Sequence, residues 1–418
     1  MVMPEGYKQT EIGEIPKDWQ IITLADVCLK NGVVRGPFGG ALKKEIFVSD
    51  GYKVYEQGNA IYRSVTRGKY YIDSNKYNEM LRFAVNSGDF IVSCSGTIGM
   101  IYKIPNNAPK GIINQALLKL TIDKTIIDSN YFYLYFSWGD FNKRITDDTQ
   151  GGAIKNLVSM ELFKKTWLLL PTLPEQEQIA ETLSDVDSMI SSLEKLIEKK
   201  KAIKQGAMQE LLTGKKRVPG FSEAWGVVQI KDIFEIHKGN GLSKEKLSVD
   251  GKYECILYGE LFTKYSEIID DVVSKTNLLE GFESQKYDVL MPGSTTTNGL
   301  DLATASTILK DNVLLGGDVI VLRPKCKVDT RILGYLLPMK AKEILQHTQG
   351  ITIVHLNTKS FRNMEVKIPV DFEEQKAIAT ILSDMDNEIE ALEQKLAKNR
   401  LLKQGMMQQL LTGKIRLV

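Results

Sequence analysis

The sequence predicts an α+β protein in which two mixed α/β globular domains alternate with two long helices as an internal repeat. Three observations predict this arrangement. The chain has 418 residues, which is more than a single hydrophobic core usually supports. A helical passage of the first half returns in the second half, and both copies carry the heptad spacing of a coiled coil. Hydrophobic residues make up 43% of the chain and charged residues 25%, as in ordinary globular proteins.

The first globular domain is expected at residues 1–165 and is expected to contain many short strands. The passage GDFIVSCSGTIGMIYKI, which begins at Gly88, predicts a strand, a Ser/Gly-rich turn and a second strand. The passage GIINQALLKLTI that follows predicts further sheet. The SCSGTIG turn has two interpretations, a hairpin connection or a phosphate-binding loop, and the hairpin is the simpler one.

The first long helix is expected within residues 166–218. The motif LPEQEQ supplies a proline and an acidic first turn, and LLTGKK supplies a glycine stop beside basic residues, as the two ends of a helix favour. Such a helix would have about 38 residues and a length of about 57 Å, which is long for a globular domain. Its apolar seam falters after Ile197, in EKKKAIK, and resumes at Met208. This interruption indicates a stutter or a partial uncoupling of the seam.

The second half repeats the plan, with a globular domain at residues 219–365 and a helix within residues 366–418. Glu175 matches Glu374 and Gly214 matches Gly413, so the helical copies are offset by 199 residues without a gap. About half of the aligned positions in this segment are identical, and WQIITLADV and WGVVQIKDI open the two globular domains alike. The expected seam residues, spaced alternately by four and three, are Ile179, Leu183, Val186, Ile190, Leu193 and Ile197 in the first copy and Ile378, Leu382, Met385, Ile389, Leu392 and Leu396 in the second.

The repeated helices have a second interpretation, in which two unrelated amphipathic helices each pack on their own domain. The two seams are similar and align without a gap, which favours the coiled coil.

Cysteine and histidine usage predicts no disulfide framework, metal site or cofactor. The four cysteines are scattered without a C-x-x-C pair, and the three histidines form no ligand cluster. The first residues, MVMPEGYKQTEIGEIP, contain no apolar signal segment, and no window approaches 18 uninterrupted apolar residues. The sequence therefore predicts a cytoplasmic protein with no membrane partner. A net charge of +2 neither requires nor excludes a nucleic-acid partner.

No catalytic residue is predicted. The LLTGKK motif resembles part of a P-loop, but Gln209 stands where the first glycine is required and Lys216 where Ser or Thr is required. The second copy fails in the same way at Gln408 and Ile415. The stretch DFEEQK at residues 371–376 vaguely resembles a nuclease triad, yet acidic residues are expected at a helix start in any case. The chain also contains no methyltransferase signature of the N-P-P-Y or D-P-P-Y type.

Three motifs give the chain a family resemblance: the two EQ..IA..LS..D..I..LE helices, their KQG.MQ.LLTGK ends, and GDFIVSCSGTIG. On these motifs the chain resembles, over essentially its whole length, the DNA specificity subunit of type I restriction-modification systems. The resemblance implies two target-recognition domains that each bind one half of a split DNA sequence, separated by two helices that pair antiparallel. It also implies double-stranded DNA, two methyltransferase subunits and motor-nuclease restriction subunits as partners. The second domain has YDVLMPGSTTTNG where the first has GDFIVSCSGTIG, so the roles of individual loops do not transfer.

The duplication has a physical reason that does not depend on the family. A DNA duplex has a two-fold axis between its strands, and a duplicated binding chain can match that symmetry. Base recognition depends on particular hydrogen-bond donors and acceptors, so two domains that bind different half-sites must differ in sequence. The helices need only a suitable length and an apolar seam, so their two copies can stay similar.

The candidate DNA-binding residues are basic and polar side chains near expected turns, in places interleaved with tyrosine. For each one, a solvated surface position is the plainer interpretation, and His355 alone would more often be structural. The TQG motif stands out because it recurs in both halves. The candidates are Arg35, Lys43, Lys44, Arg63, Arg67, Lys69, Ser95, Thr97, Gln150 and Lys155 in the first domain, and Lys238, Asn240, Lys244, Thr295, Thr296, Asn298, Gln349, His355 and Lys359 in the second.

Two other functional classes remain open from the sequence. One is a scaffold whose helices space two domains that bind ligands other than DNA, and the other is a single-chain enzyme with an unrecognised signature. Duplex binding that weakens steeply with salt argues against the scaffold. Methyl transfer by this chain alone would establish the enzyme.

Overall fold

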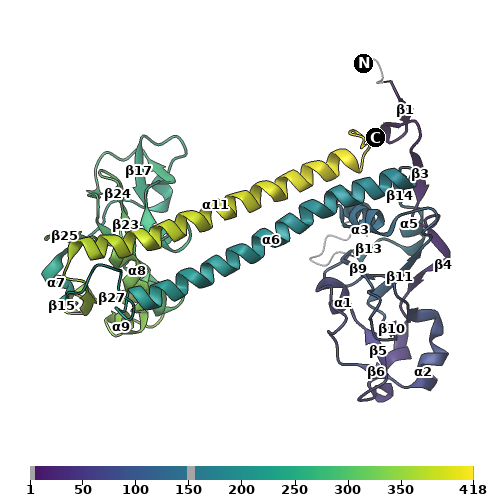
Figure 1. Ribbon diagram of the computed structural model, residues 1–418, viewed down its shortest axis with the longest axis horizontal. Helices are drawn as coiled ribbons and strands as arrows, with labels where there is room; N and C mark the ends of the chain where they lie inside the picture. The colour runs from purple at the N-terminus through teal and green to yellow at the C-terminus, as the bar shows by residue number, and fades with distance from the viewer. Residues whose placement is uncertain (1–4, 148–155, 418) are drawn as a thin grey trace. The chain divides into compact units, whose positions relative to one another are not determined.

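The structure of the protein is a computed structural model, and it describes residues 5–147 and 156–417. The chain divides into two compact units, a first unit of residues 1–192 and 396–418 and a second unit of residues 193–395. The long helices α6 (Leu173–Leu211) and α11 (Phe372–Leu410) each contribute to both units (Figure 1). The predicted division into two globular domains and two spacer helices stays a prediction. The two units are defined by packing, and the boundary between them divides both long helices.

The first unit contains a mixed α/β domain with two four-stranded sheets, ordered β4-β11-β8-β9 and β6-β5-β10-β7. Its strands are β1 (Tyr7–Thr10), β2 (Gly13–Pro16), β3 (Gln20–Thr23), β4 (Cys28–Arg35), β5 (Tyr52–Tyr55), β6 (Tyr71–Ile72), β7 (Ala84–Val85), β8 (Phe90–Ser93), β9 (Ile101–Lys103), β10 (Gly111–Ile113), β11 (Leu117–Ile122), β12 (Thr146–Asp147), β13 (Asn156–Leu157) and β14 (Trp167–Leu170). Its helices are α1 (Gln57–Ile61), α2 (Ser74–Glu79), α3 (Ser129–Ser137), α4 (Gly139–Ile145) and α5 (Met160–Lys165), with 3-10 turns η1 (Gly39–Leu42), η2 (Lys44–Ile46) and η3 (Leu81–Phe83).

The core of the first unit lies between the β4-β11-β8-β9 sheet and helix α3. Phe90 of β8 and Phe132 of α3 are buried, with ring centroids 5.1 Å apart in a tilted arrangement. Strand β8 is buried along its whole length, which explains why its sequence is almost uniformly apolar. The predicted strand, turn and strand are present, because β8 pairs antiparallel with β9. The SCSGTIG turn is therefore a hairpin connection.

The second unit contains a five-stranded sheet ordered β16-β25-β21-β23-β18, a four-stranded sheet ordered β19-β17-β24-β20 and a three-stranded sheet ordered β22-β27-β26. Its strands are β15 (Gly226–Gln229), β16 (Phe234–Lys238), β17 (Tyr253–Ile256), β18 (Ile268–Ile269), β19 (Ser274–Thr276), β20 (Phe282–Glu283), β21 (Val289–Pro292), β22 (Ser294–Thr295), β23 (Ser306–Ile308), β24 (Leu314–Leu315), β25 (Val319–Pro324), β26 (Thr348–Gln349), β27 (Val354–Leu356) and β28 (Glu365–Ile368). Its helices are α7 (Ile230–Ile233), α8 (Arg331–Met339), α9 (Ala341–Leu345) and α10 (Thr358–Phe361), with 3-10 turns η4 (Lys244–Lys246), η5 (Tyr258–Phe262) and η6 (Gly299–Ala303).

The two long helices have 39 residues each, close to the predicted length. Each ends just before a glycine with a left-handed backbone, Gly214 and Gly413, both with φ of 70°. A left-handed residue that follows a helix closes its last turn, and glycine adopts that conformation without steric cost. The LLTGK motif therefore ends both helices in the same way.

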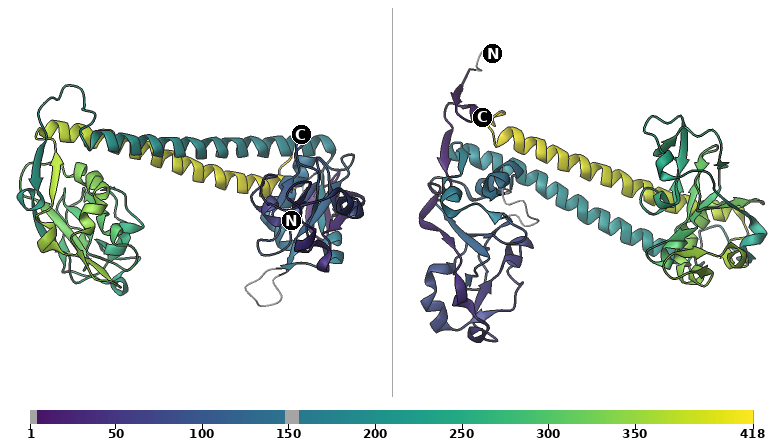
Figure 2. Two further views of the ribbon diagram at one scale, coloured as in Figure 1. Left: turned by 90° about the horizontal axis from the view of Figure 1, so that it is seen from below. Right: turned by 180° about the vertical axis from the view of Figure 1, so that it is seen from behind.

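The helices run antiparallel within each unit, as Figures 1 and 2 show. In the first unit Lys403 of α11 lies 2.6 Å from Asp187 of α6. In the second unit Lys204 of α6 lies 2.6 Å from Asp386 of α11. The two ion pairs are equivalent, because Lys204 and Lys403, and likewise Asp187 and Asp386, differ by the repeat offset of 199. The repeat therefore has pseudo-two-fold pairing.

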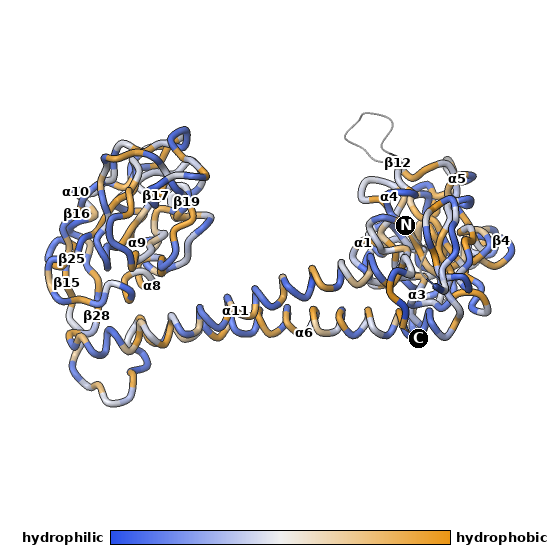
Figure 3. The backbone as a smooth tube through the Cα atoms, turned by 90° about the horizontal axis from the view of Figure 1, so that it is seen from above, coloured by the Kyte–Doolittle hydropathy of each residue, from blue (hydrophilic) through white to orange (hydrophobic). Residues whose placement is uncertain are grey.

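The apolar seam is buried most deeply near the start of each helix. All twelve expected seam residues are buried or partly buried, and Ile179, Leu183, Ile378 and Leu382 have no exposed surface. Hydrophobic and hydrophilic residues alternate along both helices in Figure 3. Beyond the point where the heptad falters, Ile203 is 47% exposed, which fits a partial uncoupling of the seam.

The end of each long helix is fixed by a buried ion pair to the start of the other. In the first unit Arg416 Nη2 lies 2.8 Å from Glu175 Oε2, and in the second unit Arg217 Nη2 lies 2.7 Å from Glu374 Oε2. Both glutamate side chains are 1% exposed. Glu374 is thus held in an ion pair at the start of the helix, which agrees with a helix-start role for the DFEEQK stretch.

Within residues 5–147 and 156–417, no helix has both the length and the apolar character that crossing a membrane requires.

Candidate nucleic-acid interface

One end of the β4-β11-β8-β9 sheet brings together two groups of candidates in the first unit. Leu118 of β11 pairs with Arg35 on one side and Val92 on the other, so Arg35 and the β8–β9 turn lie at the same end of the sheet. Ser95 and Thr97 are exposed in that turn. The turn is shaped by the hydroxyl of Ser93, which donates to the Thr97 carbonyl and accepts from the Met100 amide.

The loop between α1 and β6 presents the most concentrated group of cationic candidates. Arg63, Arg67 and Lys69 are all exposed. The Arg67 guanidinium carbon lies 3.6 Å from the ring centroid of Tyr62, and Tyr62 itself is 60% exposed. Helix α1 contacts strands β8 and β9, so this loop starts beside the β8–β9 hairpin. The sequence pointed to tyrosines interleaved with these charges, but Tyr62 was not among the candidate residues, because a stack between side chains cannot be read from sequence alone.

Lys43 joins η1 to η2, Lys44 is the first residue of η2, and both are exposed. This segment packs next to the α1–β6 loop, because Phe47 stacks on Tyr70 with ring centroids 4.5 Å apart. The structure therefore brings these two lysines near the loop that carries Lys69. The remaining two candidates of the first domain, Gln150 and Lys155, lie outside the described residues.

The three-stranded sheet β22-β27-β26 gathers most candidates of the second unit. His355 pairs with Ser294 on one side and with Gln349 on the other, and Thr295 pairs with Val354. The sheet thus places Gln349 and His355 side by side on one face, whereas the Thr295 side chain, which pairs with Val354, points to the opposite face. Thr295 is only 4% exposed, whereas Gln349 and His355 are exposed. Thr296 and Asn298, which follow β22, are exposed as well.

Lys238 joins this group through Asp318. Lys238 Nζ lies 2.6 Å from Asp318 Oδ1, and the Ser294 hydroxyl donates to Asp318 Oδ2 over 2.9 Å. Burial raises the pKa of Asp318, but the hydrogen bonds from Lys238 and Ser294 outweigh that effect and leave the pKa below its usual value. Asp318 therefore remains a carboxylate that holds Lys238 beside the β22-β27-β26 sheet.

Other candidates of the second domain have local or separate positions. Asn298 caps η6, because its side-chain oxygen accepts from the Leu300 amide over 3.1 Å. Asn240 and Lys244 are exposed in the connection between β16 and β17, and Lys359 is exposed on α10. These three are not linked to the β22-β27-β26 sheet by any hydrogen bond among the described residues.

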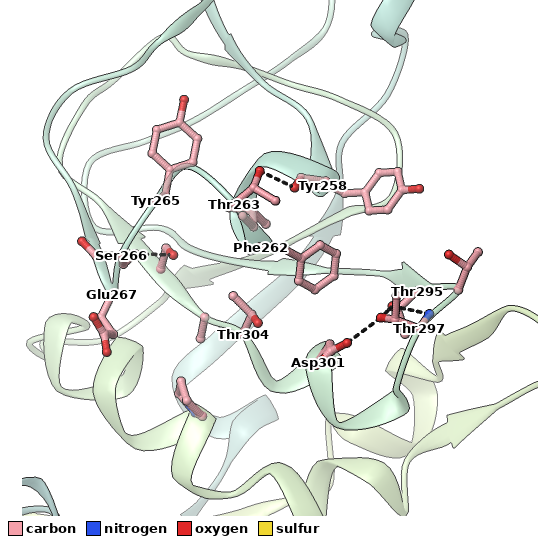
Figure 4. Close-up of a pocket in the computed structure, with 16 residues that line it drawn as sticks. Tyr258, Phe262, Thr263, Tyr265, Ser266, Glu267, Thr295, Thr297, Asp301 and Thr304 are labelled. Carbon is pink, nitrogen blue, oxygen red and sulfur yellow. Dashed lines mark hydrogen bonds between the residues drawn. The ribbon is translucent and has the colours of Figure 1, made fainter. Parts of the chain in front are cut away.

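A cavity of about 730 Å³ lies beside strand β22 (Figure 4). Its lining includes the aromatic side chains of Tyr258 and Phe262, the hydroxyls of Thr295 and Thr297, and the Asp301 carboxylate. Thr297 donates to Asp301, as the dashed line in Figure 4 shows. None of the described residues that line this cavity is a lysine or an arginine, so its polar groups suit hydrogen bonding and not phosphate binding. Of the residues that line this cavity, only Thr295 and Thr296 were candidates from the sequence. The aromatic residues Tyr258 and Phe262 come from a distant segment of the chain.

Three of the four thiols are unreactive by burial. Burial raises the pKa of the Cys28 and Cys94 thiols to about 12 and that of Cys255 to about 11. Cys326 is exposed. Over residues 5–147 and 156–417, no three His, Cys, Asp or Glu side chains come together as a group that could hold a metal ion.

Comparisons with known proteins assign the family. The family model described as "Type I restriction modification DNA specificity domain" matches residues 16–205 and again residues 222–399. The chain belongs to this family. Each match covers one globular domain and most of the long helix that follows it, so the internal repeat of the chain is a repeat of this family domain.

Relatives and solved structures match the chain over nearly its full length. The type I restriction enzyme MjaVIII specificity subunit of Methanocaldococcus jannaschii is 26% identical over 99% of this chain and 96% of its own length. The MjaIX specificity subunit of the same organism is 22% identical over 87% of this chain and 86% of its own length. A type I restriction-modification S subunit from M. genitalium shares the fold with a TM-score of 0.57 and 17% identity, covering 94% of this chain and 96% of that one. The HsdS subunit of Thermoanaerobacter tengcongensis has a TM-score of 0.51 and 16% identity, over 98% and 100% of the two chains.

Proposed function

We propose that this chain is the DNA specificity subunit of a type I restriction-modification complex and that each target-recognition domain binds one half of a bipartite DNA site. The observation that carries the proposal is the double match to the specificity-domain family, once in each half of the chain. Relatives named as specificity subunits align with the chain from end to end, so the likeness is not limited to the helices.

The proposed DNA surface differs between the two units in its chemistry. In the first unit the candidates are mainly arginines and lysines around the α1–β6 loop, which suit phosphates and guanine edges. In the second unit uncharged polar side chains outnumber lysines, and the exposed Gln349 and His355 of the β22-β27-β26 sheet lie with Lys238 held beside that sheet. Different donors and acceptors in the two domains are what two different half-sites require.

The chain is proposed to recognise DNA without performing chemistry on it. Methylation and cleavage would then come from partner proteins, namely two methyltransferase subunits and the motor-nuclease restriction subunits. We assign part of the docking surface for these partners to the exposed faces of α6 and α11 with their duplicated KQG and LLTGK ends. A cytoplasmic location follows from the proposed complex and its DNA substrate.

The two long helices are proposed to set the distance between the half-sites. This proposal is supported by their equal length of 39 residues and by the reciprocal ion pairs along them. A continuous helix resists bending, so a pair of such helices can act as a spacer of fixed length.

The decisive experiment is methylome sequencing of a methylation-free host that expresses this chain with its partner methyltransferase. A bipartite methylated motif with an unspecified spacer is expected. Exchange of residues 219–365 for the second domain of another family member should change one half of the motif and leave the other unchanged. A contiguous motif, or a change in both halves after the exchange, would contradict the proposal.

Two further measurements address the other functional classes. A salt titration of duplex binding by the purified complex should show a steep loss of affinity, whereas a scaffold for other ligands would bind no DNA. Incubation of the chain alone with a methyl donor and DNA should give no methyl transfer, and native mass spectrometry should find two methyltransferase subunits for each copy of this chain.

A further inference from the structure

The α1–β6 loop of the first unit presents an arginine whose main chain and side chain are both fixed. Asn59, which has no exposed surface, donates from its side-chain nitrogen to the carbonyls of Ser64 and Arg67 over 2.8 and 2.9 Å. The Asn59 side-chain oxygen accepts from the Glu56 amide over 2.7 Å. All the hydrogen-bonding groups of this buried amide are thus used, and two of its bonds hold the loop.

The same loop contains one residue with an uncommon backbone conformation and is held by two further hydrogen bonds. Arg63 has a left-handed backbone, with φ of 51°, which is uncommon for a residue other than glycine. Such strain persists only where neighbouring contacts hold the chain, and it is concentrated at functional sites. The Gly68 carbonyl accepts from the buried Lys53 side chain over 3.4 Å, and the Tyr70 carbonyl accepts from the Val54 amide over 2.9 Å. The loop is therefore anchored near its start by Asn59, through Ser64, and at its β6 end by these two hydrogen bonds.

The side chain of Arg67 is held by stacking. The guanidinium carbon of Arg67 lies over the exposed Tyr62 ring, 3.6 Å from the ring centroid, so the ring covers one side of the guanidinium. Among residues 5–147 and 156–417 no hydrogen bond or ion pair to the guanidinium N–H groups is found, and Arg67 is exposed. A planar cation that is fixed in place but has free donors is suited to a partner with two adjacent acceptors in one plane.

We propose that Arg67 reads a guanine in the half-site bound by the first domain and that Tyr62 is its positioning residue. This inference rests on the proposed function. Guanine presents O6 and N7 as two coplanar acceptors in the major groove, and the arginine fork matches them. Lysines such as Lys43, Lys44 and Lys69 carry flexible point charges that serve phosphates equally well. Arg67 differs from them because its orientation is fixed before DNA arrives, which lowers the entropy cost of a directional contact.

The test uses the full chain, expressed with its methyltransferase, and compares methylated motifs in the host genome. Arg67→Lys keeps the charge but loses the planar fork. The variant is expected to methylate sites that differ at one guanine of one half-site, with discrimination at that position reduced by about 5- to 150-fold. The other half-site should be unchanged. Arg82→Lys, an exposed arginine of the same unit outside the loop, is the matched control and should leave the motif as it is.

The positioning role of Tyr62 is tested by a conservative pair of variants. Tyr62→Phe retains the stacking ring and should retain the motif, whereas Tyr62→Ala should relax the same guanine position as Arg67→Lys. Because Tyr62 is exposed, neither change should unfold the domain. A purely structural residue would lower methylation at every site without relaxing any position.

Three outcomes would overturn the proposal about Arg67. They are an unchanged motif in Arg67→Lys, a uniform loss of methylation at all sites as expected for a phosphate contact, and relaxation at a position that is not guanine. Failure of the proposed function would be visible separately, because the wild-type chain would then give no bipartite motif at all.

Discussion

The ion pair between Arg416 and Glu175 gives the sharpest prediction about stability. Glu175 is 1% exposed and accepts from Arg416 and from the indole nitrogen of Trp19, which lies 2.9 Å away. Arg416 also donates to Asp18 over 2.9 and 3.0 Å. The hydrogen bond to Glu175 is the main cause that raises the pKa of Arg416 above its usual value. Replacing Arg416 by methionine keeps most of the side-chain stem but leaves the Glu175 carboxylate buried without a cation.

The expected loss follows from the position of Glu175. Removing one partner of a buried ion pair usually costs about 3–5 kcal/mol. The Trp19 hydrogen bond remains, and Glu175 lies in the first turn of α6, where the helix dipole stabilises an anion by about 0.3–1 kcal/mol. We therefore expect a loss of about 2–4 kcal/mol, within the range for buried pairs that keep other partners. For a unit of about 200 residues this corresponds to a decrease in Tm of about 5–15 °C.

The assay combines scanning calorimetry of the full chain with hydrogen exchange. Arg416→Met should lower the transition of the first unit, and the loss of protection should be confined to β1, β2 and the start of α6. Lys414→Met, at an exposed neighbour, is the control and should shift Tm little. The double variant Arg416→Met/Glu175→Gln should recover part of the loss, because it removes the buried charge. A shift below about 2 °C, or no recovery in the double variant, would refute this account of the ion pair.

Three other predictions concern the ion pairs of the long helices, the exposed cysteine and the length of the helices. Lys204 contacts two carboxylates and is 13% exposed, whereas its repeat counterpart Lys403 contacts one and is 24% exposed, so urea unfolding should show a larger loss for Lys204→Met than for Lys403→Met, with a difference of about 1 kcal/mol. An equal or reversed order would contradict the structure. A thiol reagent at pH 8 should modify one cysteine rapidly, Cys326, and peptide mapping that found a buried cysteine modified first would be the contrary result. Insertion of four residues after both Ile197 and Leu396 should lengthen the helix pair by up to about 6 Å and add one or two unspecified base pairs to the methylated motif; unchanged spacing in an active variant would show that the helices do not measure the DNA.

The long helices were predictable from the sequence because the sequence signals that specify them are local. Heptad spacing, the proline start and the glycine stop all lie within the helix itself, and the ungapped offset of 199 residues marks the second copy. The order of the strands was not predictable in this way. Strand β5 pairs in parallel with β10, which joins Lys53 to Gly111 across a long stretch of sequence, and no turn motif specifies such a pair.

The candidate site was predictable in composition but not in arrangement. The exposed Arg63, Arg67 and Lys69 were found from charge and from the nearby tyrosines. The stack of Arg67 on Tyr62 depends on a left-handed Arg63 and on the buried Asn59, and neither feature leaves a pattern in the sequence. The gathering of Thr295, Gln349 and His355 likewise depends on sheet pairing between distant segments.

The two long helices resemble each other in sequence, whereas the two globular domains differ. The ion pairs between the helices give a physical reason for this difference. Each unit contains the start of one long helix and the end of the other, so every ion pair between the helices takes one residue from each copy of the repeat. Arg217 with Glu374, and Arg416 with Glu175, are the same contact made twice. A residue that changed in one copy alone would break the contact in one unit and leave the equivalent contact intact in the other. The loops that carry the candidate DNA-binding residues have no such reciprocal partner in the described part of the chain, because the contacts found for them, such as those of Arg67 with Tyr62 and Asn59, stay within one domain. Pairing between copies therefore constrains the helices to resemble each other, while the two domains are free to differ in the side chains that they present to DNA.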